Sequence, residues 1–321
     1  MDIVVNLAVL AGLFVVIGLT EPIADRLGLP ATVVLAALGI GIGSGAAWLY
    51  FTPLTHTFNE AALAIMTLPI SSEVFLYVFL PTLIFQVALT INLRRLMDDW
   101  VPVLTLAVVA VLVATVMIGV ALQPFSGLPL IGCFLIGAIV STTDPSAVVS
   151  IFRATPAPQR LARIVEGESL LNDAAAIALF SVFLSDVVMR AAEPDVLGAL
   201  LRFPPAILLG AAVGWVVGRV AVAAMGRIGD YPLGQVTLSI AVPYAAFLLA
   251  DQAFHASGVV GVVVAGMTVN FLSPGRLSPA ALTRLRDAWD LLAHWAGSLI
   301  FVLAALLIPK LVPDLHLEIW A

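Results

Sequence analysis

The sequence has little charge of either sign. Asp, Glu, Lys and Arg together make up 11% of its 321 residues, and lysine occurs once, as Lys310. Hydrophobic residues make up 62%, whereas a soluble domain carries roughly 45–50% apolar and about 25% charged residues. Too few polar side chains are present to cover a water-soluble globule of this length. The composition therefore excludes a soluble enzyme and a disordered chain, and it predicts an all-α polytopic membrane protein.

Other absences narrow the function further. The chain has no basic tract of the kind that binds nucleic acid. Its single cysteine, Cys133, lies in an apolar run, cannot form an internal disulfide and is expected to be a small buried hydrophobe. None of the four histidines lies at a metal-ligand spacing. Because the N-terminus lacks a basic stretch and a cleavage pattern, residues 3–19 are expected to remain as a membrane span.

What the sequence does have is a series of long apolar runs. A transmembrane helix needs about 20 apolar residues to cross roughly 30 Å of hydrocarbon. This length predicts ten spans, with proline and glycine at many of the junctions. The predicted spans are 3–19, 29–50, 73–91, 101–122, 128–152, 164–188, 203–222, 233–250, 256–272 and 289–309. The long loops are 51–72 and 273–288, and either could hold a short interfacial helix.

The distribution of basic residues predicts the orientation. When the loops are numbered from the N-terminal side, the odd loops hold eleven arginines, whereas the even loops hold only Arg190, Arg202 and Lys310. The positive-inside rule then places the odd loops in the cytoplasm and the N-terminus outside. The sequence thus predicts a multi-pass protein of the cell membrane, embedded in the lipid bilayer.

Two acidic residues lie deep in the predicted spans. Most acids, Asp98 and Asp99 among them, fall in loops or at span ends and are expected to be solvated. Asp144 lies nine residues before Arg153, and Asp173 lies ten residues after Arg163. At 1.5 Å per residue, both acids lie roughly 13–15 Å from the same loop, near the bilayer centre. We expect the two carboxylates to meet there as a functional site; the alternative is two acids that are each satisfied by a helix dipole or an arginine.

The sequence around Asp144 predicts a break in its helix. Ser141-Thr142-Thr143-Asp144-Pro145 interrupts an apolar span, and Pro145 disfavours helix at the residue before it. A broken helix within a membrane is tolerated where its backbone is buried or lines a cavity. The hydroxyls of Thr142 and Thr143 and the freed carbonyls are oxygen ligands that suit a hard cation. A broken helix at 141–146 is therefore predicted, although a simple kink stabilised by the threonines also fits.

The next predicted span carries a second polar group. In Glu166-Gly167-Glu168-Ser169-Leu170-Leu171-Asn172-Asp173, the side chains of Ser169 and Asp173 share one helix face. Glu168, which is shallower, and Asn172 are also four residues apart, on the adjacent face. Asn172 could orient a carboxylate or form a bond across helices, and simple helix packing fits it equally well.

These motifs resemble those of a known family. The stretch from Gly137 to Phe183 closely resembles the NhaP/NHE-like branch of the cation:proton antiporters, and Phe79-Leu80-Pro81-Thr82-Leu83-Ile84-Phe85 is similar to its third-helix signature. The resemblance implies an NhaA-like fold of two inverted repeats, with a crossed pair of broken helices, thirteen spans and a homodimer. It also implies scaffold and dimerisation helices in 1–100, core ion-binding helices in 101–190, and a linker helix with scaffold helices of the second repeat in 191–321.

The resemblance also implies roles for single residues. Asp173 would be the acid that binds the proton and the cation, and Asp144, Ser169 and the carbonyl of Thr143 would be further ligands. Asn172 would be structural, and Glu168 would pair with an arginine on the eleventh helix. No resident cofactor is implied.

Two departures from the family pattern stand out. The third-helix signature normally ends in an acid, where this chain has Gln86. The amide oxygen of Gln86 could still ligate a cation, but one negative charge is absent. In addition, only ten spans fit, and residue 321 falls about where the eleventh would begin, so we expect a truncated chain that lacks the last helices of the fold.

The sequence therefore predicts a secondary transporter and not an enzyme. It would exchange a monovalent cation, Na⁺ before K⁺ or Li⁺, for H⁺ by competition at the Asp144 and Asp173 carboxylates. Asn172 beside Asp173, where related branches have two acids, implies electroneutral exchange by resemblance. Three alternatives remain: a K⁺/H⁺ antiporter, a non-transporting membrane scaffold or sensor, and an intramembrane aspartyl protease, whose own signatures the sequence lacks.

Overall fold

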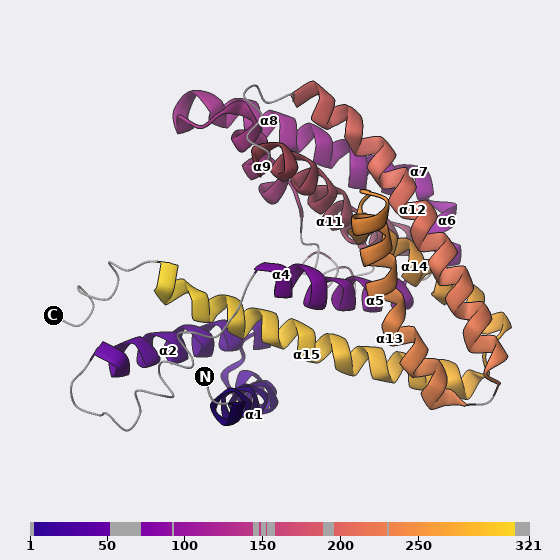
Figure 1. Ribbon diagram of the computed structural model, residues 1–321, viewed down its shortest axis with the longest axis horizontal. Coiled ribbons are helices and arrows are strands. Elements are labelled where there is room, and N and C mark those ends of the chain that lie inside the picture. The colour runs from indigo at the N-terminus through magenta and orange to yellow at the C-terminus, as the bar shows by residue number, and fades with distance from the viewer. Residues whose placement is uncertain are drawn as a thin grey trace. The chain divides into compact units, whose positions relative to one another are not determined.

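The computed structural model contains helices and connecting turns, and no strand, in the part of the chain that it describes (Figure 1). The described residues are 3–51, 72–91, 93–143, 148, 152, 158–188, 196–229 and 231–311. The longer helices are α1 (Ile3–Leu27), α2 (Ala31–Phe51), α5 (Leu80–Thr90), α8 (Val111–Ser126), α9 (Leu130–Val140), α11 (Gln159–Val188), α12 (Val196–Arg227), α13 (Pro232–Leu248), α14 (Gly258–Leu272) and α15 (Pro279–Leu311). The short ones are α4 (Ser72–Val74), α6 (Leu93–Asp98), α7 (Trp100–Leu104), the 3₁₀ turn η5 (Ser273–Gly275), and the π-helical turns η2 (Phe75–Phe79), η3 (Thr105–Ala110) and η4 (Leu249–Ala253).

The helices agree with a polytopic membrane protein. Among the described residues, seven helices are long and apolar enough to cross a bilayer, and the shorter apolar helices cover Ala31–Ala46, Phe75–Thr90 and Leu130–Val140. Each of the ten predicted spans overlaps one of these helices. A helix that crosses lipid must satisfy its own backbone groups, which explains why the apolar runs are helical.

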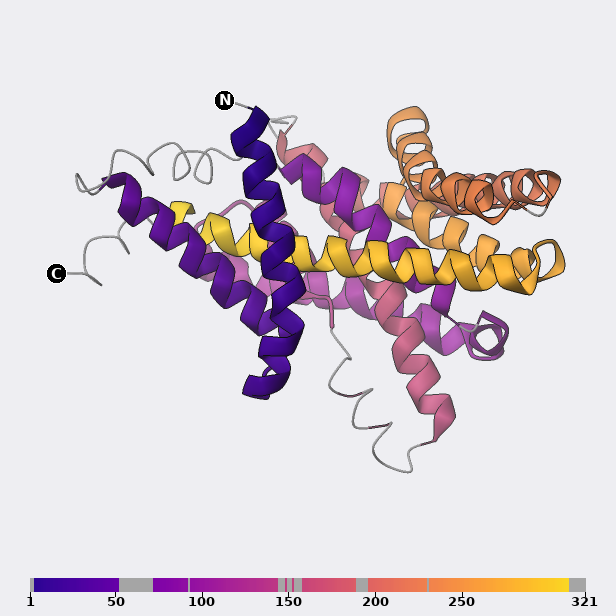
Figure 2. The same ribbon diagram turned by 90° about the horizontal axis from the view of Figure 1, so that it is seen from below.

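The chain divides into two compact units. The first unit comprises residues 1–79 and 290–321 and includes α1, α2 and the C-terminal part of α15. In this unit, Phe14 of α1 packs edge-on against Trp295 of α15, with ring centroids 5.6 Å apart. Nearby, Nδ1 of His294 lies 3.6 Å from Oε1 of Glu21. These contacts attach α1 to α15, the long yellow helix of Figure 2.

The second unit comprises residues 80–289 and holds the motifs around Asp144 and Asp173. Its helices approach one another closely through glycine. A Cβ atom added at Gly214 of α12 would lie 2.1 Å from the carbonyl oxygen of Gly261 in α14. Small residues of this kind allow membrane helices to pack backbone against backbone. The contact fixes α12 against α14 inside this unit.

One expected loop is largely helical. The loop predicted at 273–288 gives way to α15 at Pro279, ten residues before the predicted span at 289. The hydroxyl of Ser278 accepts a hydrogen bond from the backbone N–H of Ala281, as a helix N-cap does. Ala281, Leu285 and Trp289 are buried at four-residue intervals. The length rule for spans placed this amphipathic segment in a loop because its outer face is charged, and the sequence analysis allowed a short interfacial helix there.

The expectation for Asp99 is wrong. Asp99 lies between α6 and α7 and is buried, whereas the neighbouring Asp98 is exposed. The Nε of Arg160, in the first turn of α11, donates to Oδ1 of Asp99 at 2.7 Å. A buried charge needs such a partner. The ion pair therefore joins the start of α11 to the α6–α7 segment.

Candidate cation site

The end of α9 is the first structural element of the site. The helix stops at Val140, Ser141 is its C-cap residue, and Thr142 and Thr143 are not helical. The hydroxyl of Ser141 donates back to the carbonyl of Ala138 at 3.0 Å, which satisfies a free carbonyl at the helix end. The chain thus leaves helical geometry within the apolar span where Pro145 predicts it to do so, although Asp144 and Pro145 themselves lie outside the described residues.

Asn172 of α11 ties this end of α9 to α11. Its Nδ2 donates to Oγ1 of Thr143 at 2.9 Å and to Oε1 of Glu168 at 2.8 Å, and it lies 3.4 Å from the carbonyl oxygen of Thr143. The hydroxyl of Thr143 in turn donates to the same Oε1 of Glu168 at 3.1 Å. Asn172 itself is fully buried, Glu168 is half-buried and Thr143 is exposed. The amide, the hydroxyl and the carboxylate form a closed triangle of hydrogen bonds.

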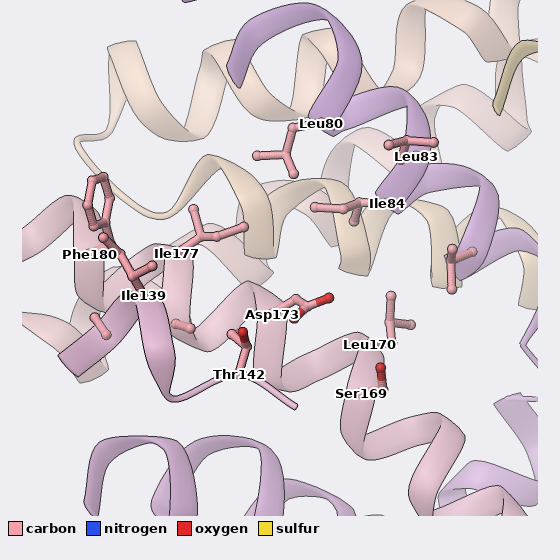
Figure 3. Close-up of a pocket in the computed structure, with 13 residues that line it drawn as sticks. Leu80, Leu83, Ile84, Ile139, Thr142, Ser169, Leu170, Asp173, Ile177 and Phe180 are labelled. Carbon is pink, nitrogen blue, oxygen red and sulfur yellow. The ribbon is translucent and has the colours of Figure 1, made fainter. Parts of the chain in front are cut away.

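A cavity of about 600 Å³ lies between α5, α9 and α11. Its walls are mostly apolar: Leu80, Leu83, Ile84 and Val87 from α5, Ala138 and Ile139 from α9, and Leu170, Ala176, Ile177 and Phe180 from α11. The remaining lining residues are Thr142, Ser169 and Asp173. Figure 3 shows the carboxylate of Asp173 projecting from α11 toward α5, with Thr142 beside it. Among the described lining residues, Asp173 is the only ionisable one.

The polar groups of this cavity are all oxygen donors. A carboxylate, a threonine hydroxyl and a serine hydroxyl offer the hard ligands that alkali and alkaline-earth cations prefer. They lie among apolar side chains, which do not compete for a cation. In the described part of the chain, no group of three His, Cys, Asp or Glu side chains could hold a metal ion. The cavity therefore offers three oxygen groups to a hard cation.

The structure brings together some of the predicted site residues and not others. Ser169 and Asp173 share a helix face and both line the cavity with Thr142. Asn172 and Glu168 share the adjacent face, and Nδ2 of Asn172 bonds both to the Glu168 carboxylate and to Thr143, beyond the end of α9. Gln86 is half-buried on α5 but is not among the lining residues, because α5 presents its apolar side to the cavity. The predicted meeting of Asp144 with Asp173 stays a prediction.

Two features of the site were missed by sequence reasoning. One is the leucine and isoleucine wall of α5, which sequence alone does not distinguish from lipid-facing residues. The other is Thr115 of α8, a fully buried side chain whose hydroxyl donates to that of Ser141 at 3.2 Å. A single threonine in an apolar helix does not indicate a contact with another helix, because the hydroxyls of such residues commonly bond to the backbone of their own helix.

A family model and several relatives match the chain. The model of the family described as "Sodium/hydrogen exchanger, transmembrane" matches residues 11–321. The Na(+)/H(+) antiporter NhaG of Bacillus atrophaeus is 33% identical over 307 residues, which cover 94% of this chain and 56% of NhaG. The Na(+)/H(+) antiporter ApNhaP of Aphanothece halophytica is 31% identical over 276 residues, which cover 86% of this chain and 49% of ApNhaP. The chain thus spans about half the length of these curated relatives.

A solved structure has the same fold. The sodium proton antiporter MjNhaP1 from Methanocaldococcus jannaschii, solved at pH 8, matches with a TM-score of 0.69 at 20% sequence identity. The match covers 98% of this chain and 73% of that one. At this identity, the similarity shows the fold alone.

Proposed function

The chain belongs to the sodium/hydrogen exchanger family, a family of transporters and not of enzymes, and on this premise we propose that it exchanges a monovalent cation for H⁺ across a membrane. We propose Na⁺ as the cation because two relatives are named as Na(+)/H(+) antiporters. Asp173 is the group that carries either the cation or the proton. Asp144, Ser169, Thr142 and the carbonyl of Thr143 complete the cation's oxygen shell.

The position of Asp173 is the observation that carries this proposal. It is the one ionisable side chain among the described lining residues of a mostly apolar cavity, and it shares that cavity with the hydroxyls of Ser169, on the same helix, and Thr142, just after the end of α9. A carboxylate in such surroundings is stabilised in its ionised form by a bound cation and is neutralised by a proton. Because one carboxylate cannot hold both at full occupancy, cation and proton compete for it.

Competition at one site gives exchange when the site is exposed to the two sides in turn. A cation that binds on one side releases a proton there, and a proton that binds on the other side releases the cation. In transporters built from inverted repeats, this alternation comes from rocking one helix bundle against the other around the site. We propose the same motion here, in the inverted-repeat fold and the homodimer that the family resemblance implies.

The neutral Asn172 beside Asp173 supports electroneutral exchange. An amide side chain does not ionise, so Asn172 adds no titrating charge to the site, and its Nδ2 bonds to Thr143 and Glu168. One carboxylate that trades one cation for one proton moves no net charge. The arginine-rich odd loops support an orientation with the N-terminus outside.

Proteoliposomes test the proposal. The wild-type chain is reconstituted with a pH-sensitive dye inside, a pH gradient is imposed, and Na⁺, K⁺ or Li⁺ is added outside. We expect Na⁺-dependent proton flux that Asp173→Asn abolishes and that Asp98→Asn, an exposed acid on α6, leaves unchanged. Undiminished flux in Asp173→Asn would refute the assignment. Flux with K⁺ and none with Na⁺ would make the chain a K⁺/H⁺ antiporter, and Na⁺ binding without any flux would make it a scaffold or sensor.

A further inference from the structure

Thr115 of α8 is a buried hydroxyl that the exchange mechanism does not use. Its side chain is 0% exposed, and it faces the last turn of α9, where Ser141 is 8% exposed. Oγ1 of Thr115 donates to Oγ of Ser141 at 3.2 Å, and Oγ of Ser141 donates to the carbonyl of Ala138 at 3.0 Å. A chain of two hydrogen bonds therefore runs from α8 to the end of α9.

The backbones of α8 and α9 meet at the same place. A Cβ atom added at Gly137 would lie 2.5 Å from the carbonyl oxygen of Thr115. Gly137 is four residues before Ser141, so it lies one helical turn away from it. The close backbone approach at Gly137 and the hydrogen bond at Ser141 therefore involve the same last turn of α9. Thr115 thus contacts the last turn of α9 through both its side chain and its backbone, which leaves this turn little freedom to move.

The last turn of α9 sets the position of two candidate cation ligands. Thr142 and Thr143 follow Ser141 directly and have no helical hydrogen bonds of their own to hold them. Thr142 lines the cavity with Asp173, and Thr143 is bonded to Asn172 and Glu168. A shift at Ser141 would move both threonines relative to α11, because they are the next residues in the chain.

We propose that Thr115 is a positioning residue of the cation site: its hydroxyl fixes where α9 ends and so holds Thr142 and Thr143 at their distance from Asp173. The inference rests on the proposed function, because it assigns Thr115 a part in cation binding. Thr115 touches neither the cavity nor the cation, and it acts through Ser141. Loss of the hydroxyl should weaken cation binding more than it slows turnover.

The test compares variants of the chain in proteoliposomes, with Na⁺ affinity measured separately by calorimetry. Thr115→Val keeps the shape of the side chain and removes the hydroxyl. Because one neutral hydrogen bond is worth about a five-fold change in an equilibrium constant, we expect the KM and the Kd for Na⁺ to rise about five-fold while kcat changes less than about two-fold. Thr115→Ser restores the hydroxyl and should recover the wild-type KM. Ser141→Ala should raise KM similarly, and the double variant should be no worse than either single variant.

Thr105→Val is the matched control, because the hydroxyl of Thr105 bonds only within its own helix, to the carbonyl of Val101 at 2.8 Å, and is exposed. A KM for Thr115→Val equal to that of Thr105→Val would overturn the inference. A KM for Thr115→Ser as high as that for Thr115→Val would also overturn it, since the methyl group and not the hydroxyl would then matter. A wild-type chain without flux contradicts the proposed function, and the calorimetric Kd values still decide the role of Thr115.

Discussion

Asn172 on α11 holds the chain at Thr143, just beyond the end of α9, through a side-chain hydrogen bond of 2.9 Å from Nδ2 to Oγ1. The same Nδ2 reaches Oε1 of Glu168, so one amide joins the non-helical residues after α9 to a carboxylate on α11. Asp173, the next residue after Asn172, faces the cavity. The bond from Asn172 to Thr143 therefore sets the spacing between the two polar walls of the candidate site.

Removal of this amide should impair both folding and transport. Asn172→Ala deletes a fully buried side chain and its bonds to Thr143 and Glu168. We expect the free energy of unfolding to fall by about 2–3 kcal/mol, and the KM for Na⁺ to rise. Denaturant titration of the purified protein and flux in proteoliposomes measure the two effects. Gln252→Ala, an exposed amide on η4, is the control; equal stability of the two variants would contradict this role.

The pair of Asp99 and Arg160 should contribute measurable stability. Asp99 is buried and Arg160 is mostly exposed, with side-chain exposures of 5% and 69%. Arg160→Gln removes the guanidinium that pairs with a buried carboxylate, and this lowers the stability of the fold. Because Arg160 is mostly exposed, solvent screens the ion pair and limits the loss of stability. We expect a fall of about 1–2 kcal/mol in the free energy of unfolding. Arg227→Gln removes an exposed arginine that bonds to its own helix and should change little; a loss of the same size there would count against the pair.

The contact of α12 with α14 should not tolerate a methyl group. Gly214→Ala places a Cβ 2.1 Å from the carbonyl oxygen of Gly261, so the helices must move apart. We expect a loss of about 1–3 kcal/mol, measured as a lower midpoint of denaturation. Gly41→Ala in α2 has no atom within 4 Å of the new Cβ and should be neutral or slightly stabilising, because alanine favours helix. Similar effects at both positions would show that close packing is not the cause.

The pH dependence of transport follows from competition. If one proton excludes one cation, lower pH fills the site with protons and raises the apparent KM for Na⁺. In the range where the site is largely protonated, the KM should rise about tenfold for each pH unit of acidification, while the maximal rate at saturating Na⁺ changes less. Initial rates over a grid of Na⁺ concentrations and pH values measure this slope. A KM that does not vary with pH would exclude competition.

Much of the fold could be predicted from the sequence because lipid imposes simple rules. Apolar length located the seven long and three shorter apolar helices of the described residues, and the motifs at Gly137–Phe183 identified the family, which the family model confirms. The rule failed where a helix is amphipathic: the first ten residues of α15 carry charges that a span should lack. Sequence alone also could not show that Asp99 is buried and Asp98 is exposed, because this difference depends on the turn between α6 and α7, which directs the Asp99 side chain inward and the Asp98 side chain outward.

The candidate site was predictable where it follows helix periodicity. Spacing placed Ser169 with Asp173 and Glu168 with Asn172, since both pairs lie on a single helix. The partners on other helices were not accessible in this way. Neither the bond from Asn172 to Thr143 nor that from Thr115 to Ser141 follows from spacing, because each depends on how two helices cross.

Proton release on Na⁺ binding tests the central claim, that Asp173 holds either a proton or a cation. Calorimetric titrations of Na⁺ into the detergent-solubilised protein, in buffers of different ionisation enthalpy, count the protons released. At a pH where the site is protonated, the account predicts about one proton released for each Na⁺ bound by the wild type, and no Na⁺ binding by Asp173→Asn. Na⁺ binding without proton release, or binding unchanged in Asp173→Asn, would contradict it.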